Sequence, residues 1–352
     1  MNLLDVINEL VEERGLDRSV LSAIVCEGIL GAYQRKYPDV SLAVDYDKKS
    51  GEFQVRVTKT VVTAVENENR EITLRKARNI DSSVQLGQEM QLPFDGSIGR
   101  VEILKAKQFI AQKIREIEAK AIYDALKPKE GTIVHGTVHK VERGGTLVTL
   151  PEGSAFLPRS LTIPDEKCIP GHPIRALLKE VLVEPRAENQ LILDRVSPKF
   201  LELLFELEIP EIYEKIVEIK KIARAAGYKS KVVVASTDNN IDPVGTCVGI
   251  GGARIKPILK ELGTEKIDII EYSASREEFV AQCLKPAEIN RVEIIDNARA
   301  RVWLNEDQRS LAIGKMGKNI TLASQLTGLE IELVSSGQAA HEPQLDFEQT
   351  EL

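Results

Sequence analysis

The chain has 352 residues and a formal net charge of −7, because 54 acidic side chains outnumber 47 basic ones. Its length suits about two or three domains, and a hydrophobic content of 43% is enough to give each of them a core. No apolar run reaches the roughly 18 residues of a membrane span and no secretory signal opens the chain, so we expect a cytoplasmic protein without membrane contact. The acidic balance also excludes an overall basic field, so nucleic acid could be held only by local patches.

The first 128 residues have an α/β pattern. Apolar residues with helical spacing begin at Leu3 and resume after the capping candidates Asp17 and Ser19. The charges of a later long helix are interpreted as a solvated face. The expected elements are helices over the apolar stripes 3–11 and 20–33, strands at 42–46 and 52–65 joined by a turn at 48–51, and a helix from about residue 99 to residue 126.

From Gly131 the pattern changes to short strands separated by turns. Five strands within about 70 residues are typical of a five-stranded Greek-key barrel, the OB fold, and their spacing fits its S1 subtype. We therefore expect residues 130–196 to form an S1 barrel. Its expected strands are 132–141, 146–150, 154–158, 174–184 and 190–194.

One face of such a barrel binds single-stranded nucleic acid, usually with aromatic side chains on which bases stack. The barrel offers one aromatic candidate, Phe156, and three basic ones, Lys140, Arg143 and Arg159. A role in RNA binding is therefore open beside the alternative of a spacer that sets the geometry of its neighbours.

No constellation of residues predicts a metal, a cofactor or a catalytic centre. His135 and His139 lie four residues apart on one expected strand, but no third ligand accompanies them. The four cysteines form no Cys-x-x-Cys pair, which argues against zinc and against a disulfide framework. They are Cys26, Cys168, Cys247 and Cys283.

Two Gly-x-x-Gly loops in matching frames dominate the second half of the chain. They read Gly249-Ile250-Gly251-Gly252 and Gly314-Lys315-Met316-Gly317. A glycine loop lets the backbone bend sharply and approach a ligand, and the helix that follows offers its N–H groups to phosphate. The KH domain uses this device to clamp about four nucleotides of a single strand.

Each loop is preceded by a helix, two strands and a helix, and is followed by a helix and a strand, which is the order of the type II KH fold. We therefore predict two KH domains, at 198–274 and 275–336. The first has a helix at 200–207 and strands at 216–222, 231–235 and 266–272; the second has a helix at 276–284 and strands at 292–296, 300–304 and 329–334.

The two loops carry different charges. The second has Lys315 within the loop and Lys318 directly after it, whereas the first has its cations, Arg254 and Lys256, one turn later. Because a cation within the loop reaches phosphate directly, we expect the second unit to contribute more electrostatic affinity for RNA.

The order of these parts resembles the NusA family of bacterial transcription elongation and termination factors. The resemblance covers residues 1–335 and is strongest from residue 130 onward. The matching runs are 157–160, 205–212, 227–232, 240–249 and 262–270, and a looser match lies around 94–100. The chain departs from the family pattern at two points. The family's first loop usually has Arg where this chain has Gly251, which puts strong phosphate contact there in doubt. No long acidic repeat domain follows the second KH unit.

The resemblance implies that the first domain docks on the RNA polymerase core near the RNA exit channel. The barrel and KH units would then guide nascent single-stranded RNA, favouring hairpin-dependent pauses and intrinsic termination, and would support antitermination with other Nus factors. We expect a monomer without a cofactor, and a disordered acidic tail at 337–352.

Two alternatives remain open from the sequence. A ribonuclease that uses KH and S1 modules to capture RNA would need clustered carboxylates for metal ions, and no segment supplies them. An RNA chaperone or ribosome-assembly factor would lack only the polymerase contact, which leaves no motif in a sequence. Co-elution with ribosomal particles instead of polymerase would favour the second alternative.

Overall fold

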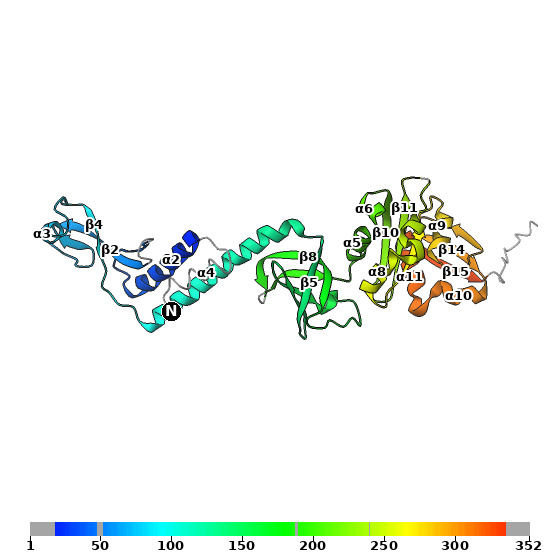
Figure 1. Cartoon of the computed structure of the whole chain (residues 1–352), viewed down its shortest axis with the longest axis horizontal. Coiled ribbons are helices and arrows are strands. Elements are labelled where there is room, and N and C mark those ends of the chain that lie inside the picture. Colours follow the sequence, from blue (N-terminus) through cyan, green and yellow to red (C-terminus); the bar gives the residue numbers. More distant parts are fainter. Residues whose placement is uncertain (1–17, 48–51, 187–188, 239, 336–352) are drawn as a thin grey trace, which may run out of the picture. The chain divides into compact units, whose positions relative to one another are not determined.

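The computed structural model describes residues 18–47, 52–186, 189–238 and 240–335 (Figure 1). The chain divides into two compact units, Met1–Ile122 and Tyr123–Leu352, each of which is described by itself. The helix predicted over 3–11, the cap at Asp17, the turn at 48–51 and the tail at 337–352 lie outside the described residues. Among the helices that are described, none has the length and apolar character needed to cross a membrane.

The first unit is a small sheet with two longer helices, and β2 is its central strand. β2 pairs antiparallel with β1 and β4 and parallel with β3. The elements are α2 (Arg18–Lys36), β1 (Leu42–Tyr46), β2 (Phe53–Val62), β3 (Glu71–Thr73), α3 (Leu74–Arg78), β4 (Glu89–Pro93) and α4 (Arg100–Leu126), whose last four residues belong to the second unit. The helices α2 and α4 and the strands β1 and β2 were predicted, whereas β3, α3 and β4 were not.

A close helix contact organises the core of this unit. Leu21 and Val25 of α2 pack against Ile110 and Ile114 of α4. A Cβ atom at Gly28 would lie 2.6 Å from Ile110 Cγ1, so a glycine is needed where the two helices approach each other.

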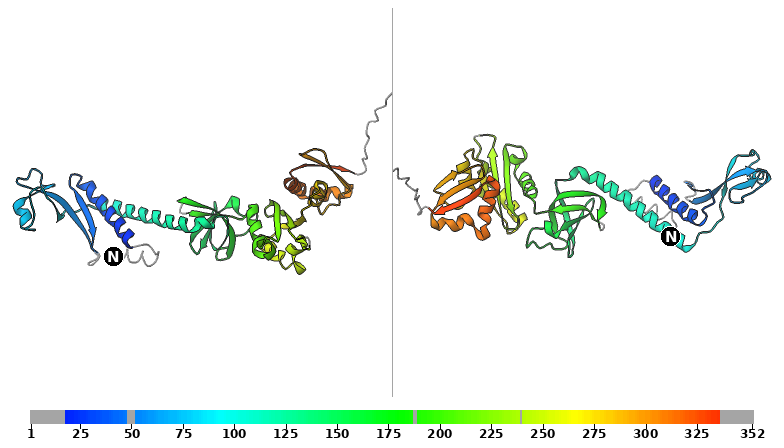
Figure 2. Two further views of the ribbon diagram at one scale, coloured as in Figure 1. Left: turned by 90° about the horizontal axis from the view of Figure 1, so that it is seen from above. Right: turned by 180° about the vertical axis from the view of Figure 1, so that it is seen from behind.

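The second unit begins with the closed barrel, in the strand order β5-β6-β7-β9-β8 (green in Figure 2). Its elements are η1 (Lys127–Lys129), β5 (Ile133–Val141), β6 (Gly145–Leu150), β7 (Gly153–Pro158), η2 (Arg159–Leu161), β8 (Pro173–Arg186) and β9 (Asn189–Asp194). All five strands were predicted. The barrel interior is filled by apolar side chains from every second position, among them Val138, Val148, Leu157 and Leu193.

The first KH unit follows the barrel and has the predicted element order. Its strands form the sheet β10-β11-β12, with β11 and β12 parallel. The elements are α5 (Pro198–Glu208), α6 (Pro210–Tyr213), β10 (Val217–Ala225), β11 (Lys229–Ser236), α7 (Pro243–Val248), η3 (Ile250–Gly252), α8 (Ile255–Leu262) and β12 (Lys266–Glu271). One face of the sheet packs on its own helices through Val232 and Val234, against Phe200, Leu204 and Ile258.

The second KH unit repeats this order with the sheet β13-β14-β15, except that α6 has no counterpart among its described residues. The elements are α9 (Arg276–Cys283), β13 (Arg291–Ile294), β14 (Arg299–Leu304), α10 (Glu306–Ile313), η4 (Lys315–Gly317), α11 (Lys318–Thr327) and β15 (Glu330–Ser335). Its strands were predicted to within about two residues, which is the ordinary uncertainty of an element's end.

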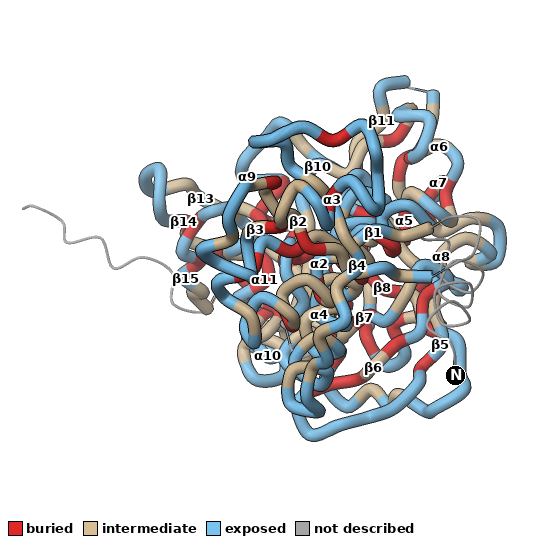
Figure 3. Tube along the Cα trace, turned by 90° about the vertical axis from the view of Figure 1, so that its left-hand side faces the viewer, coloured by how far each residue is buried: buried red, intermediate tan, exposed pale blue. Residues whose placement is uncertain are grey.

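The two KH units share one hydrophobic core. From the second face of the first sheet, the side chains of Ala223, Val233 and Ile270 pack into a cluster formed by the second unit. Val280 and Leu326 are members of that cluster. The sheet β10-β11-β12 is therefore covered on both faces, and β11 is buried over most of its length (Figure 3).

Lysines of the first sheet tie this shared core to helix ends of the second unit. Lys221 Nζ donates to the carbonyl of Leu326, at the end of α11, over 2.8 Å. Lys231 Nζ donates to Lys285 O over 3.0 Å, just after α9, and to Asp268 over 2.8 Å. Cations at helix C-termini are favourable because the unpaired carbonyls there carry partial negative charge. Burial lowers the pKa of Lys231, while its bond to Asp268 opposes that shift.

Buried guanidinium groups hold the barrel against the first KH unit. Arg195 directly follows β9, and its side chain is only 2% exposed. It donates to Glu166 in the barrel over 2.5 Å and to Glu261 of α8 over 2.6 Å, and its guanidinium lies 5.1 Å from the ring centroid of Phe200. Each charge is therefore paired, as burial requires.

A second buried pair closes the turn between β10 and β11. The carboxylate of Glu265 accepts from Arg224 over 2.9 and 3.0 Å, from Ser230 Oγ over 2.5 Å and from the Gly227 amide over 2.9 Å. Both charged side chains of the pair are fully buried.

We expect Glu265→Gln to lower the free energy of unfolding of the second unit by about 3–5 kcal/mol, because it leaves the buried Arg224 charge unpaired. Urea unfolding followed by the emission of Trp303, the one tryptophan of the chain, measures this directly. The matched control is Glu142→Gln, which removes an exposed pair with Lys140 in the same unit and should leave the unfolding midpoint unchanged. Equal midpoints for both variants would contradict the structural role of the buried pair.

Candidate nucleic-acid interface

The two glycine loops have the same backbone conformation. The first residues, Gly249 (φ 72°, ψ 165°) and Gly314 (φ 71°, ψ 173°), have nearly identical dihedral angles. The third residues, Gly251 (φ 60°) and Met316 (φ 55°), both have left-handed φ values. Glycine adopts that region without strain and methionine does not, so Gly251 is the conformationally easier residue at this position.

A glycine is required at the first position because the fifth residue along packs against it. A Cβ atom at Gly249 would lie 2.9 Å from Arg254 Cγ, and one at Gly314 would lie 2.7 Å from Asn319 Cβ. Both distances are shorter than van der Waals contact. The loop therefore closes on the start of the next helix in both units.

The fifth residue also donates hydrogen bonds to carbonyls of the helix that precedes the loop. In the first unit the Arg254 guanidinium donates to Thr246 O and to Glu211 Oε1, each over 2.8 Å. Arg254, which was predicted to bind phosphate, is therefore ion-paired with Glu211 and stabilises the loop. Nothing in its sequence neighbourhood signals this, because Glu211 precedes it by 43 residues.

In the second unit the corresponding residue is Asn319, which is 3% exposed. Its Nδ2 donates to Leu311 O over 3.3 Å, to Ala312 O over 3.1 Å and to Leu284 O over 3.1 Å. Its Oδ1 accepts from Lys229 Nζ of the first unit over 3.2 Å. Asn319 was not predicted, although its position five residues after Gly314 matches that of Arg254 after Gly249.

The outer side of each loop is available to a ligand. Ile250 is 99% exposed and Met316 is 83% exposed, and Lys315 between the glycines is exposed as well. The helices α8 and α11 have no side-chain cap and no acidic residue in their first turn. Their first N–H groups are therefore left for water or for an anionic ligand.

Cations surround the second loop more closely than the first. Lys315 lies in the loop and Lys318 opens α11, and neither takes part in an ion pair with the residues that the structure describes. At the first loop, Lys256 folds its side chain over Gly252, where a Cβ atom would lie 3.3 Å from Lys256 Cε. The expectation that the second unit contributes more electrostatic affinity for RNA stays a prediction.

A basic hollow of about 570 Å³ continues from the first loop toward the barrel. Lys256 and Lys260, one turn apart on α8, and Arg175 of β8 supply its positive charge, and Glu261 is its one acidic residue. Lys260 and Arg175 were not predicted from the sequence. The spacing of Lys260 from Lys256 could have identified it, whereas Arg175 is brought there only by the packing of the barrel.

A β-bulge places Lys140 on the outer face of the barrel. Val138 is buried opposite Val148, and the register then shifts so that Lys140 pairs with Leu147. Leu147 in turn pairs with Phe156. The extra residue, His139, breaks the alternation, so that the lysine, the leucine and the aromatic ring follow one another across three strands.

The other basic candidates lie at the neighbouring turn. The amide of Arg159 donates to Gly144 O over 3.0 Å, next to Arg143. A Cβ atom at Gly145 would lie 2.8 Å from Phe156 Cζ, so the turn lies against the ring. The structure therefore brings Lys140, Arg143, Arg159 and Phe156 to one part of the barrel. In the described residues no three His, Cys, Asp or Glu side chains converge as a metal site would require, and His135 and His139 are separated by the bulge.

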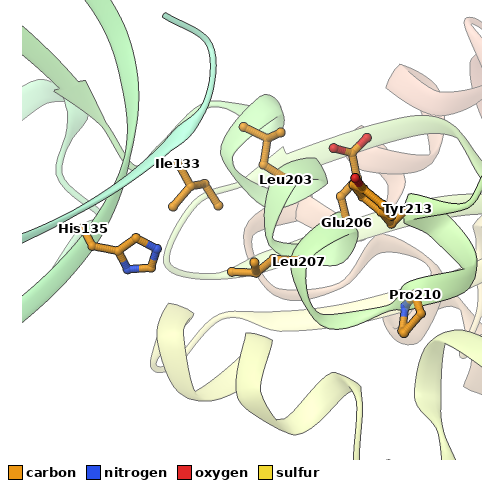
Figure 4. Close-up of a pocket in the computed structure, with 7 residues that line it drawn as sticks. All are labelled: Ile133, His135, Leu203, Glu206, Leu207, Pro210 and Tyr213. Carbon is orange, nitrogen blue, oxygen red and sulfur yellow. The ribbon is translucent and has the colours of Figure 1, made fainter. Parts of the chain in front are cut away.

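A mainly apolar hollow of about 500 Å³ lies where β5 meets α5 and α6 (Figure 4). Its seven lining residues are Ile133, His135, Leu203, Glu206, Leu207, Pro210 and Tyr213. None of them is a lysine or an arginine, and Glu206 is paired with Lys215 over 3.2 Å. This hollow has no cation to hold a phosphate, unlike the one at α8.

Three family profiles match successive parts of the chain: the NusA N-terminal domain over residues 2–120, the NusA-like first KH domain over 195–272 and the NusA-like second KH domain over 276–341. The transcription termination/antitermination protein NusA of Thermus thermophilus is 42% identical over 301 residues, which are 85% of this chain and 77% of that protein. The Bacillus subtilis protein of the same name is 34% identical over 342 residues, 96% of this chain and 91% of that protein. The Rickettsia conorii protein is 33% identical over 355 residues, covering 99% of this chain and 70% of that protein.

We expect Asn319→Ala to lower the free energy of unfolding by about 1–3 kcal/mol, because the carbonyls of Leu284, Leu311 and Ala312 lose a donor. The same variant should weaken binding of single-stranded RNA, since the second loop loses its support. Urea unfolding and fluorescence anisotropy of a labelled RNA measure the two effects. Gln325→Ala, an exposed change on the same helix, is the control and should alter neither. An Asn319→Ala protein with normal stability and affinity would show that these hydrogen bonds do not support the loop.

Proposed function

This chain belongs to the NusA family of transcription termination/antitermination proteins, and we propose that it modulates pausing, intrinsic termination and antitermination by guiding nascent RNA. The family consists of transcription factors and not of enzymes, which sets aside the ribonuclease alternative. In this proposal the barrel and the two KH units form the RNA-guiding part, and the first domain supplies the attachment to RNA polymerase.

The observation that carries the proposal is the matched pair of glycine loops. Both have the same dihedral angles, and both open on helices without a side-chain cap. Each could hold a short stretch of a single strand by its phosphates. Because the two KH units share one core, the two stretches would be held at a constant separation.

The proposed RNA-binding residues differ in what they do. Lys315, Lys318 and Lys256 would meet phosphates, and the backbone of both loops would approach the strand. Arg254 would position the first loop through Glu211 instead of contacting RNA. On the barrel, Phe156 would stack a base while Lys140, Arg143 and Arg159 hold the flanking phosphates.

The proposed attachment rests on the first domain, whose profile match spans residues 2–120. We infer that it docks on the polymerase core near the RNA exit channel, and that other Nus factors join the complex for antitermination. The proposed domain limits are 1–128, 130–196, 198–274 and 275–336, with a tail from 337, and the proposed state is a monomer. A tether of this kind raises the effective concentration of RNA at the KH units, so weak contacts suffice.

We expect Lys315→Ala to weaken binding of single-stranded RNA roughly threefold to tenfold and to make the slope of log affinity against log salt shallower by about 0.7, the value for one lost phosphate contact. Conversely, Ile250→Lys should strengthen binding and steepen the slope, because it places a cation at the same position of the first loop. Anisotropy titrations at several salt concentrations measure both.

Lys107→Ala, an exposed change in α4, is the matched control for loss of charge. If Lys315→Ala and Lys107→Ala gave the same affinity and the same slope, the second loop would not be a phosphate site.

We expect the protein to lengthen a hairpin-stabilised pause in single-round transcription by a bacterial core polymerase. Deleting residues 1–128 should abolish this effect while RNA binding is retained, because the attachment is lost and the RNA-guiding part is not. A dwell time that is unaffected by the full chain, with RNA binding intact, would instead favour the RNA-chaperone alternative.

A further inference from the structure

The outer face of the last sheet, β13-β14-β15, is built differently from the corresponding face of the first KH unit. Within each sheet, side chains alternate between the two faces. In the second unit Val292, Ala300, Val302 and Leu333 face the helices and the shared core. The opposite face carries Arg291, Glu293, Arg301, Trp303, Glu332 and Val334, which follow one another across the strands.

The strand pairings align this face with that of the first unit position by position. Lys229 pairs with Lys266 in the first sheet as Arg299 pairs with Glu330 in the second. By the same register Lys221, Lys231 and Val233 correspond to Arg291, Arg301 and Trp303, while Ala223 corresponds to Glu293 and Ile270 to Val334. The lysines of the first sheet thus correspond to arginines in the second, and the small buried residue Ala223 corresponds to the carboxylate Glu293.

These replacements make packing of the kind that covers the first sheet unfavourable. There, Ala223 is 4% exposed beneath the second unit. At the corresponding position the Glu293 side chain is 48% exposed, and an apolar helix face laid over it would bury its charge. A second copy of this chain cannot supply the helices either, because its own α9 and α11 are already packed between two sheets. The face therefore suits a ligand that is itself polar and charged.

The centre of the face is an aromatic ring between two guanidinium groups. The Cζ atom of Arg291 lies 4.9 Å from the centroid of the Trp303 ring, and that of Arg301 lies 6.0 Å from it. A half-buried tryptophan on a sheet offers a stacking surface to a nucleobase, and flanking guanidinium groups offer charge to phosphates and planes for stacking.

The carboxylates on this face do not prevent that use. Arg291 is 3.5 Å from Glu293, with side-chain exposures of 69% and 48%. Arg301 is 3.1 Å from Glu332, with exposures of 41% and 58%. Exposed pairs of this kind are weak, so a phosphate can replace a carboxylate with little loss. A carboxylate released in this way can accept from the amino group of a base.

We propose that the outer face of β13-β14-β15 is a second RNA site of the last KH unit, in which a base of single-stranded RNA stacks on Trp303 and its phosphates contact Arg291 and Arg301. The proposal rests on the proposed function in requiring that the chain binds RNA. It adds a contact on the sheet, apart from the Gly-x-x-Gly loops, that reads the face of a base and not only its backbone.

Trp303 is the one tryptophan of the chain, so its emission reports on this face directly. The full chain is titrated with a mixed-sequence RNA about 20 nucleotides long, enough to span several KH-sized segments. Anisotropy of a labelled copy of the same RNA measures total binding in parallel. We expect Trp303 emission to be quenched saturably, over the same concentration range as the anisotropy change.

Variants separate this face from the loops. Trp303→Leu should weaken RNA binding by at least about fivefold, the lower end for loss of one stacked base, while Trp303→Phe should retain most of the affinity. The double variant Arg291→Ala/Arg301→Ala should reduce the quench more than it reduces total binding. In Lys315→Ala the quench should persist at saturating RNA. Tyr213→Leu removes an exposed aromatic residue elsewhere and is the control.

The outcomes distinguish the two proposals. Full RNA binding by anisotropy with unchanged Trp303 emission would overturn the sheet site, leave the loops in place and assign the face to a protein partner. A quench that is unaltered in the double arginine variant would also overturn it, since the ring would then be reporting on the loops indirectly. Absence of any RNA binding would overturn the proposed function itself.

Discussion

The rest of the second unit depends on one constraint: the first KH sheet is covered on both of its faces. Val232 and Val234 face the helices of their own unit, and Val233 between them faces the helices of the next. A strand buried on both sides has a continuous apolar run instead of an alternating one, and β11 shows this. Packed cores of this kind do not deform continuously, so the two KH units keep one relative alignment.

Polar contacts within this core select one alignment of the two units. An apolar seam alone tolerates sliding, whereas Lys221 and Lys231 must each reach the carbonyl of a particular helix end. Burial of Lys231 is unfavourable by itself and lowers its pKa, so its position depends on the hydrogen bonds to Asp268 and to Lys285 O. Asn319 aligns the second loop in the same way. It accepts a hydrogen bond from Lys229 of the first unit and donates one to the helix that precedes the loop.

Sequence patterns predicted those parts of the fold that repeat a local signal. The two glycine loops, the barrel strands and the long α4 helix all have such a signal, and the structure confirms them. A three-residue strand such as β3 is too short to show a period, and it was missed together with α3 and β4. A period of two would have placed Lys140 inside the barrel with Val138, because nothing in the sequence marks the bulge at His139. Arg195 and Asn319 resemble ordinary polar residues until distant carboxylates and carbonyls are brought to them.

The modest charge of the chain follows from how its parts are joined. A separate RNA-binding protein needs a strong basic surface, because it must capture RNA from solution and bear the full entropy of association. Two loops held in one rigid body share that entropy cost, since binding at Lys315 brings the strand to the first loop already aligned. Under the proposed attachment to polymerase, the transcript is supplied at high local concentration as well. A chain with a net charge of −7 can then guide RNA with a few well-placed cations. Where a cation is missing from a loop, as at Ile250, the RNA strand would dissociate more easily as transcription proceeds.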